Sequence, residues 1–147
     1  MAGDLDLLNH NCGGEAALNA ARNIANDATQ VTPGRLRPAV AEAIDLGDGG
    51  APIAYASVRG GQPTLHSKVG EILSRVPASQ RGRGHGRCGL ALCLTEALST
   101  GRDPYGATAA AVTVRSRVTH ESHGVGVGAC SSCSSLVEHF NLKFVTG

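Results

Sequence analysis

The chain contains few aromatic residues and no long hydrophobic run. Its 147 residues include no tryptophan, two tyrosines and two phenylalanines, so the core must be built from Leu, Val, Ile and Ala. Such a shortage of aromatic rings argues against a nucleic-acid interface that stacks a row of bases. No segment approaches the ~18–20 apolar residues of a membrane span, so we expect no membrane partner.

We also expect no signal peptide at the start of this sequence. The segment Met1–Asp6 lacks the basic stretch and the apolar stretch that a signal peptide needs. Two locations therefore fit the sequence: a cytoplasmic one, or export as the end of a longer chain. The length and the hydrophobic fraction of 41% are those of one globular unit with a core of its own.

The net charge of +1 is nearly neutral, but the charges are unevenly placed. Arg81, Arg83 and Arg87 cluster around His85 in a glycine-rich segment. A local basic patch of this kind can contact phosphate although the chain as a whole is not basic. A solvated loop without a ligand is the alternative.

The first third of the chain shows helical patterning. Apolar residues at a spacing of three to four predict a helix over residues 13–27 and a second, short helix over residues 35–46. A glycine-rich turn follows at residues 47–50. We place a boundary there, between an N-terminal helical segment, residues 1–50, and a main sheet domain, residues 51–147.

Beyond this boundary, strand and helix patterns alternate. The expected order is strands 53–58 and 62–66, helices 68–76 and 88–100, strand 108–118, helix 130–140 and strand 142–145. Strands that alternate with helices predict an α/β fold in layers around a mixed sheet. We expect the helices at 88–100 and 130–140 to lie on one face of the sheet, with their N-termini close together.

Three of the five cysteines have the pattern of a metal site rather than of a disulfide framework. Cys130 and Cys133 form a Cys-x-x-Cys at one predicted helix start, and Cys88 stands at another. Backbone amides in the first turn of a helix favour the thiolate form that binds metal. Three protein ligands with an open fourth position are typical of catalytic zinc, so the sequence predicts a Zn²⁺ site at these cysteines.

Other uses of these thiols stay open. The Cys-x-x-Cys also suits a redox pair or two small buried residues. Cys12, next to His10 and Asn11, offers a thiol nucleophile. Cys93 would point about 140° away from Cys88 on a helix, so we expect it in the core.

Several segments resemble the YwqJ-like deaminase family of bacterial polymorphic toxins. They are Arg83–Cys88, Cys93–Leu98, Ala129–Leu136 and Phe140–Val145, and the resemblance spans residues 52–147. It implies a cytidine-deaminase-like mixed sheet flanked by helices. It also implies that Cys88 is the first zinc ligand, and that Cys130 and Cys133 are the other two.

The resemblance further implies an activity. Zinc-activated water would remove the exocyclic amine of a nucleobase, in nucleic acid or in a nucleotide. Arg87, His120 and His123 are the expected substrate contacts. A toxin of this kind acts in the cytoplasm of a target cell and has an immunity protein as a partner.

One departure from the family pattern concerns proton transfer. The family triplet is Cys-Ala-Glu, whereas this chain has Cys88, Gly89 and Leu90, so the glutamate is missing. A positioned proton-transfer group contributes ~10²–10⁴-fold in rate. His85 and Glu71 are the catalytic candidates that remain. Alternatively, the chain is a catalytically degenerate zinc domain that binds protein or nucleic acid, with Leu90 a core residue of its helix.

Overall fold

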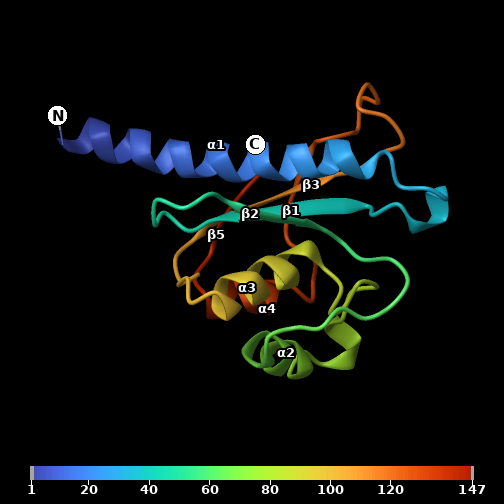
Figure 1. The fold of residues 1–147 in the computed structure, drawn as a ribbon. Helices are drawn as coiled ribbons and strands as arrows, with labels where there is room; N and C mark the ends of the chain where they lie inside the picture. Colours follow the sequence, from blue (N-terminus) through green and yellow to red (C-terminus); the bar gives the residue numbers. More distant parts are fainter. Residues whose placement is uncertain (1, 147) are drawn as a thin grey trace.

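The computed structural model describes the backbone of residues 2–146 and the side chains of residues 13–146. One five-stranded mixed sheet carries helices on both faces (Figure 1). The strands are β1 Val40–Asp45, β2 Ile53–Ala56, β3 Thr108–Thr113, β4 Gly126–Val127 and β5 Lys143–Val145. The helices are α1 Ala2–Ala28, α2 Ser67–Ser74, α3 Gly89–Ser99 and α4 Ser134–His139, with short 3₁₀ turns at Gly34–Leu36 and Ala78–Gln80.

The sheet is built around β1 and β3. β1 pairs antiparallel with β2 on one edge and with β3 on the other. The far edge of β3 is shared by two short strands, β4 running antiparallel to it and β5 running parallel. This mixed sheet between helices confirms the fold class expected from the sequence.

Helix α1 covers one face of the sheet through very small side chains (Figure 1). Ala17, Ala21 and Ala25 are fully buried against a sheet surface that includes Ala43 and Ala110. Methyl groups on both sides let the helix backbone approach the strands closely. The helix expected over residues 13–27 is confirmed, and it begins earlier.

The other face carries α2, α3 and α4 (Figure 1). A single core cluster joins these helices to the sheet, and it includes Ile44, Leu90, Leu94, Leu136 and Phe140. Helices α3 and α4 thus lie on the same face, as expected. Among the helices of residues 2–146, none combines the length and the apolar character needed to cross a membrane.

The helix expected over residues 35–46 is wrong, because residues 40–45 form the strand β1. Pro38 disfavours helical backbone in the residue before it, and the pairing of β1 with strands on both edges overrides the local helical pattern. The division at residue 50 stays a prediction about domain organisation. Within the sheet, β1 lies before that position and pairs with β2 and β3 after it.

The strand expected over residues 62–66 is also wrong, because this segment is a loop leading into α2. β2 pairs with β1, which precedes it in the chain, and not with this segment. The loop ends on His66, whose backbone N–H donates to Thr95 Oγ1 at 3.0 Å. His66 Nδ1 in turn accepts from the Lys68 N–H at 3.1 Å and caps α2.

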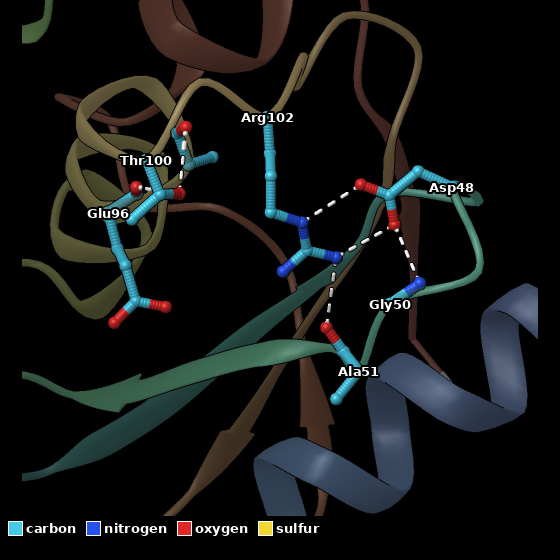
Figure 2. Close-up of polar contacts among 7 residues, drawn as sticks. Asp48, Gly50, Ala51, Glu96, Thr100 and Arg102 are labelled. Atoms are coloured by element: carbon cyan, nitrogen blue, oxygen red, sulfur yellow. Dashed lines mark hydrogen bonds and ion pairs between the residues drawn. The ribbon is translucent and has the colours of Figure 1, made fainter.

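The turn between β1 and β2 is tied to the C-terminal end of α3 (Figure 2). Arg102 donates from Nε and Nη2 to the two oxygens of Asp48, at 2.9 and 2.8 Å, and from Nη2 to the Ala51 carbonyl at 3.2 Å. The Gly50 N–H donates to the same carboxylate at 2.9 Å. These bonds hold the pKa of Asp48 well below its usual range. They fix one end of α3 against the hairpin, while its other end carries Cys88.

Candidate metal and catalytic site

Three cysteine sulfurs meet where α3 and α4 begin. Cys88 is the N-cap of α3, Cys133 is the N-cap of α4, and Cys130 lies in the loop just before it. The three sulfurs lie within 4.8 Å of one another, and those of Cys88 and Cys130 are 3.2 Å apart. Cys88 and Cys133 are buried, whereas Cys130 is exposed. The cluster could hold a metal ion with one side accessible.

The spacing of the sulfurs fits zinc. A tetrahedral ion with Zn–S bonds of ~2.3 Å places its sulfur ligands about 3.8 Å apart. Sulfurs already gathered within 4.8 Å need only small side-chain adjustments to reach this geometry. Cys93 lies elsewhere: it is fully buried and donates to the Glu42 and Ile53 carbonyls, at 3.6 and 3.4 Å. The expectation that Cys93 is a core residue is confirmed.

The thiol acidities show that the cluster favours one thiolate without a cation. Hydrogen bonds from Cys133 and Cys88 hold the pKa of Cys130 far below the usual thiol range. The same contact with Cys130 raises the pKa of Cys88 to about 12 and raises that of Cys133 still further. A second and third thiolate therefore need a bound cation to offset their repulsion.

A carboxylate that the sequence analysis missed lies beside this cluster. Glu42 on β1 has only 5% of its surface exposed. The backbone N–H groups of Gly89 and Leu90, at the start of α3, lie close enough to its carboxylate to favour the charged form. Burial, and then the negative charge of Cys130, raises the pKa of Glu42 to about 7, and the two amides oppose this rise. Glu42 is thus poised to exchange a proton near neutral pH.

Strand alternation explains why Glu42 points to this face. Ala41 and Ala43 belong to the core under α1, whereas Ile44 belongs to the core under α3. Because successive side chains of a strand point to opposite faces, Glu42 shares the α3 face with Ile44. The only sequence signal was a single acidic residue inside the apolar run Val40–Ile44.

The missing side chain of Gly89 allows α3 to begin against the sheet. A Cβ atom there would lie 2.3 Å from the Tyr55 carbonyl oxygen and 3.3 Å from Glu42 Cβ. The next residue, Leu90, is fully buried in the core. The interpretation of Leu90 as a core residue is confirmed. Its backbone N–H, rather than its side chain, contributes to the site.

The cluster opens into a cavity of about 620 Å³. Its lining includes Glu42, Cys88, Cys130 and three arginines: Arg59, Arg83 and Arg87. The Nε atom of Arg87 is buried without a hydrogen-bond partner, and its Nη2 donates to the Arg83 carbonyl at 3.2 Å. The cavity thus combines a thiol cluster, a buried carboxylate and positive charge.

His85 serves as a contact between the arginine-rich loop and the Cys-x-x-Cys loop. Its Nδ1 lies 2.9 Å from Oγ of the buried Ser132, which also accepts from the Gly82 N–H at 2.8 Å. The Ser132 hydroxyl therefore joins both loops, through the Gly82 N–H and the ring of His85. Burial, and then the charge of Arg81, lowers the pKa of His85. His85 is not among the residues that line the cavity.

The other catalytic candidate, Glu71, lies on the surface of α2. It is exposed and forms an ion pair with Arg75, one helical turn further on. The cavity lining does not include it. A catalytic role for Glu71 or for His85 stays a prediction.

The two histidines expected to contact substrate make local hydrogen bonds. His123 Nδ1 accepts from the Arg115 N–H at 3.0 Å, and its Nε2 lies 2.8 Å from Asn26 Oδ1 on α1. His120 Nδ1 accepts from the Ser122 N–H at 3.1 Å. Neither lines the cavity, whereas Arg87 does. Substrate binding by these three residues stays a prediction. The side chains of His10 and Cys12 lie outside the described residues.

The mixed sheet between helices, with a possible metal site at two helix starts, is the architecture of a deaminase-like protein. The family model of the YwqJ-like deaminases matches residues 26–142. The chain belongs to this family. The match starts before the residue 52 that the sequence resemblance indicated, and it therefore includes β1 and Glu42. No curated protein and no solved structure matches the chain.

Proposed function

We propose that the protein is a zinc-dependent hydrolytic deaminase of the bacterial toxin type. It would remove the exocyclic amine from a nucleobase, in nucleic acid or in a nucleotide. The observation that carries this proposal is the three-thiol cluster opening into a cavity of about 620 Å³. Membership of the deaminase family supports the reaction class.

The site contains residues that would bind the metal and a cavity that would bind the substrate. Cys88, Cys130 and Cys133 would hold zinc, and the Cys133 N–H donates to the Cys130 sulfur at 3.3 Å and stabilises its charge. Zinc bound there supplies a Lewis acid that lowers the pKa of water. The cavity volume lies within the ~300–1,000 Å³ typical of small-molecule sites, and so suits a nucleobase with its sugar.

The arginines that line the cavity favour a phosphate-bearing substrate. Arg59, Arg83 and Arg87 bring three positive charges to a chain whose net charge is +1. The chain has few rings on which bases could stack, so phosphate contacts would supply much of the affinity. In the toxin setting, the site of action would be the cytoplasm of a target cell, and an immunity protein would be the natural partner.

The experiment pairs metal analysis with a deamination screen. Purified native protein should contain one zinc per chain and should deaminate at least one member of a panel of nucleosides, nucleotides, single-stranded and duplex DNA, and RNA. Cys130→Ser should lose both zinc and activity. The control is Cys93→Ala, which removes a thiol outside the cluster and should keep the zinc. A native protein without zinc under reducing conditions would refute the proposal.

One observation favours a second candidate function. Residue 90 carries no carboxylate, and its leucine is a core residue. A catalytically degenerate zinc domain that binds protein or nucleic acid would keep the metal and the fold without this group. One zinc per chain, no deamination on the whole panel, and retention of a nucleic acid or a partner protein would identify this function.

A further inference from the structure

We propose that Glu42, on the central strand, is the catalytic carboxylate of this protein and replaces the glutamate missing at residue 90. The inference rests on the proposed deaminase function. In the family triplet, the carboxylate would extend from the first turn of α3 itself. Here, the structure presents a carboxylate to the same helix start from the strand opposite.

The first argument is position. Glu42 lines the cavity together with Cys88 and Cys130, and the N–H groups of Gly89 and Leu90, directly after the first thiol of the cluster, lie close enough to its carboxylate to lower its pKa. The carboxylate therefore shares one cavity wall with the thiols that would hold the metal ion. A substrate in this cavity would meet Glu42 although Glu42 does not belong to the motif.

The second argument is that no cation offsets the charge of this buried carboxylate. No ion pair of Glu42 with Lys, Arg or His occurs among the described residues. An unpaired charge inside a protein costs several kcal/mol, and an alanine, like its neighbours Ala41 and Ala43, would pack there without that penalty. Buried acids that persist at such a penalty, in a cavity, mark functional sites.

The third argument is that other carboxylates near α3 are engaged elsewhere. Glu96 accepts a hydrogen bond of 2.6 Å from the Tyr55 hydroxyl, which raises the pKa of Tyr55 to about 12. Asp48 is bound by Arg102 at the far end of the helix. Glu71 is paired on the surface. None of these three lines the cavity, whereas Glu42 does.

The reaction needs one group that takes up and returns protons. Water adds its oxygen to the amine-bearing carbon of the base, and Glu42 accepts one water proton and passes it to the adjacent ring nitrogen. Glu42 then takes the proton of the new hydroxyl and delivers it to the amine. The C–N bond breaks, ammonia leaves, and a carbonyl remains. The carboxylate ends as it began, and no oxidant or reductant is needed.

The activity test compares two Glu→Gln substitutions. Glu42→Gln keeps the size of the side chain and one oxygen near the two amides, but it removes the basic group. We expect kcat to fall ~10²–10⁴-fold with zinc content unchanged. Glu138→Gln, on the exposed surface of α4, should leave zinc content and kcat unchanged. A Glu42→Gln variant that binds zinc and keeps kcat within threefold of the native value would overturn the proposal.

A crystal structure of the zinc-loaded native protein supplies a readout independent of activity. We expect a Glu42 oxygen within hydrogen-bonding distance of the group in the fourth zinc position, with the zinc on three sulfurs. A Glu42 oxygen bound directly to zinc would mean a closed, four-ligand structural site. That result would refute the catalytic role, as would a carboxylate too far away to reach the fourth ligand.

The two measurements separate failure of this inference from failure of the proposed function. Inactivity of the zinc-loaded native protein on the whole panel, with Glu42 at the fourth ligand, would refute the proposed substrates and support the position assigned to the carboxylate. Native activity that survives Glu42→Gln would support the deaminase function and refute the role of Glu42.

Discussion

Substitution of Gly89 tests whether close contact between α3 and β2 positions the site. Alanine at this position would place its Cβ atom 2.3 Å from the carbonyl oxygen of Tyr55 on β2 and 3.3 Å from Glu42 Cβ. Close C···O contacts in proteins are about 3.3–3.6 Å, so α3 and β2 would have to separate by roughly 1 Å. This substitution would restore the alanine of the family triplet, yet we expect it to be harmful here.

The size of the effect follows from what is displaced. Overpacking in a core typically costs ~1–3 kcal/mol, and here the obstacle is backbone held in a sheet, so we expect at least about 3 kcal/mol. For a chain of this length, that loss lowers Tm by roughly 6–12 °C. The start of α3 would move together with Cys88 and the amides near Glu42, so zinc affinity should fall as well.

The assay is thermal unfolding of the reduced protein with and without zinc, together with a zinc competition titration. Gly70→Ala is the matched control, because that glycine lies within α2 and a Cβ there meets nothing within 4 Å. It should stabilise the protein by ~0.5–1 kcal/mol. If Gly89→Ala unfolds at the native temperature and binds zinc equally well, the close contact between α3 and β2 does not position the site.

Three further predictions concern the core, the pH dependence and the metal. Leu90→Glu should lower the free energy of unfolding by several kcal/mol, because it buries a carboxylate in the core. The control Leu90→Met should change the free energy of unfolding by less than ~1.5 kcal/mol. A Leu90→Glu protein that is stable in thermal unfolding and more active than the native protein would contradict this. The folded-state pKa of Glu42 is raised from 4.5 to about 7. The contribution of Glu42 to the free energy of unfolding of the metal-free protein should therefore be complete below pH 4.5, and ~3 kcal/mol of it should be lost as the pH rises through 7. Denaturant unfolding at a series of pH values should show this loss in the native protein and not in Glu42→Gln. The native protein at a free zinc concentration of ~100 Kd should have a Tm roughly 5–10 °C higher than the same protein after zinc is removed with a chelator. If the chelator lowers the Tm of Cys130→Ser by a similar amount, the zinc is not bound at the thiol cluster.

Local patterns in the sequence were enough to predict several elements and the thiol cluster. The apolar spacing over residues 13–27 and 88–100 reflects one buried face of α1 and of α3, and a helix with one buried face repeats every three to four residues wherever it packs. Cys130 and Cys133 are close in sequence, so their proximity needs only one turn of chain. The position of Cys88 at a helix start was also visible, because a glycine-rich loop precedes a clear apolar stripe.

Only the tertiary structure decided the nature of β1 and, with it, the position of Glu42. The apolar residues Ala39, Val40, Ala43 and Ile44 fit one side of a helix, and on that helix Glu42 would have faced solvent. Pairing with β2 and β3 makes the segment a strand, and the period of two turns Glu42 toward α3. Strand pairing joins residues that are far apart in the chain, as with Glu42 and Ala111, so no local pattern contains it. Strand pairing therefore determines the position of the carboxylate beside the thiol cluster, whereas the thiols themselves could be predicted from the sequence.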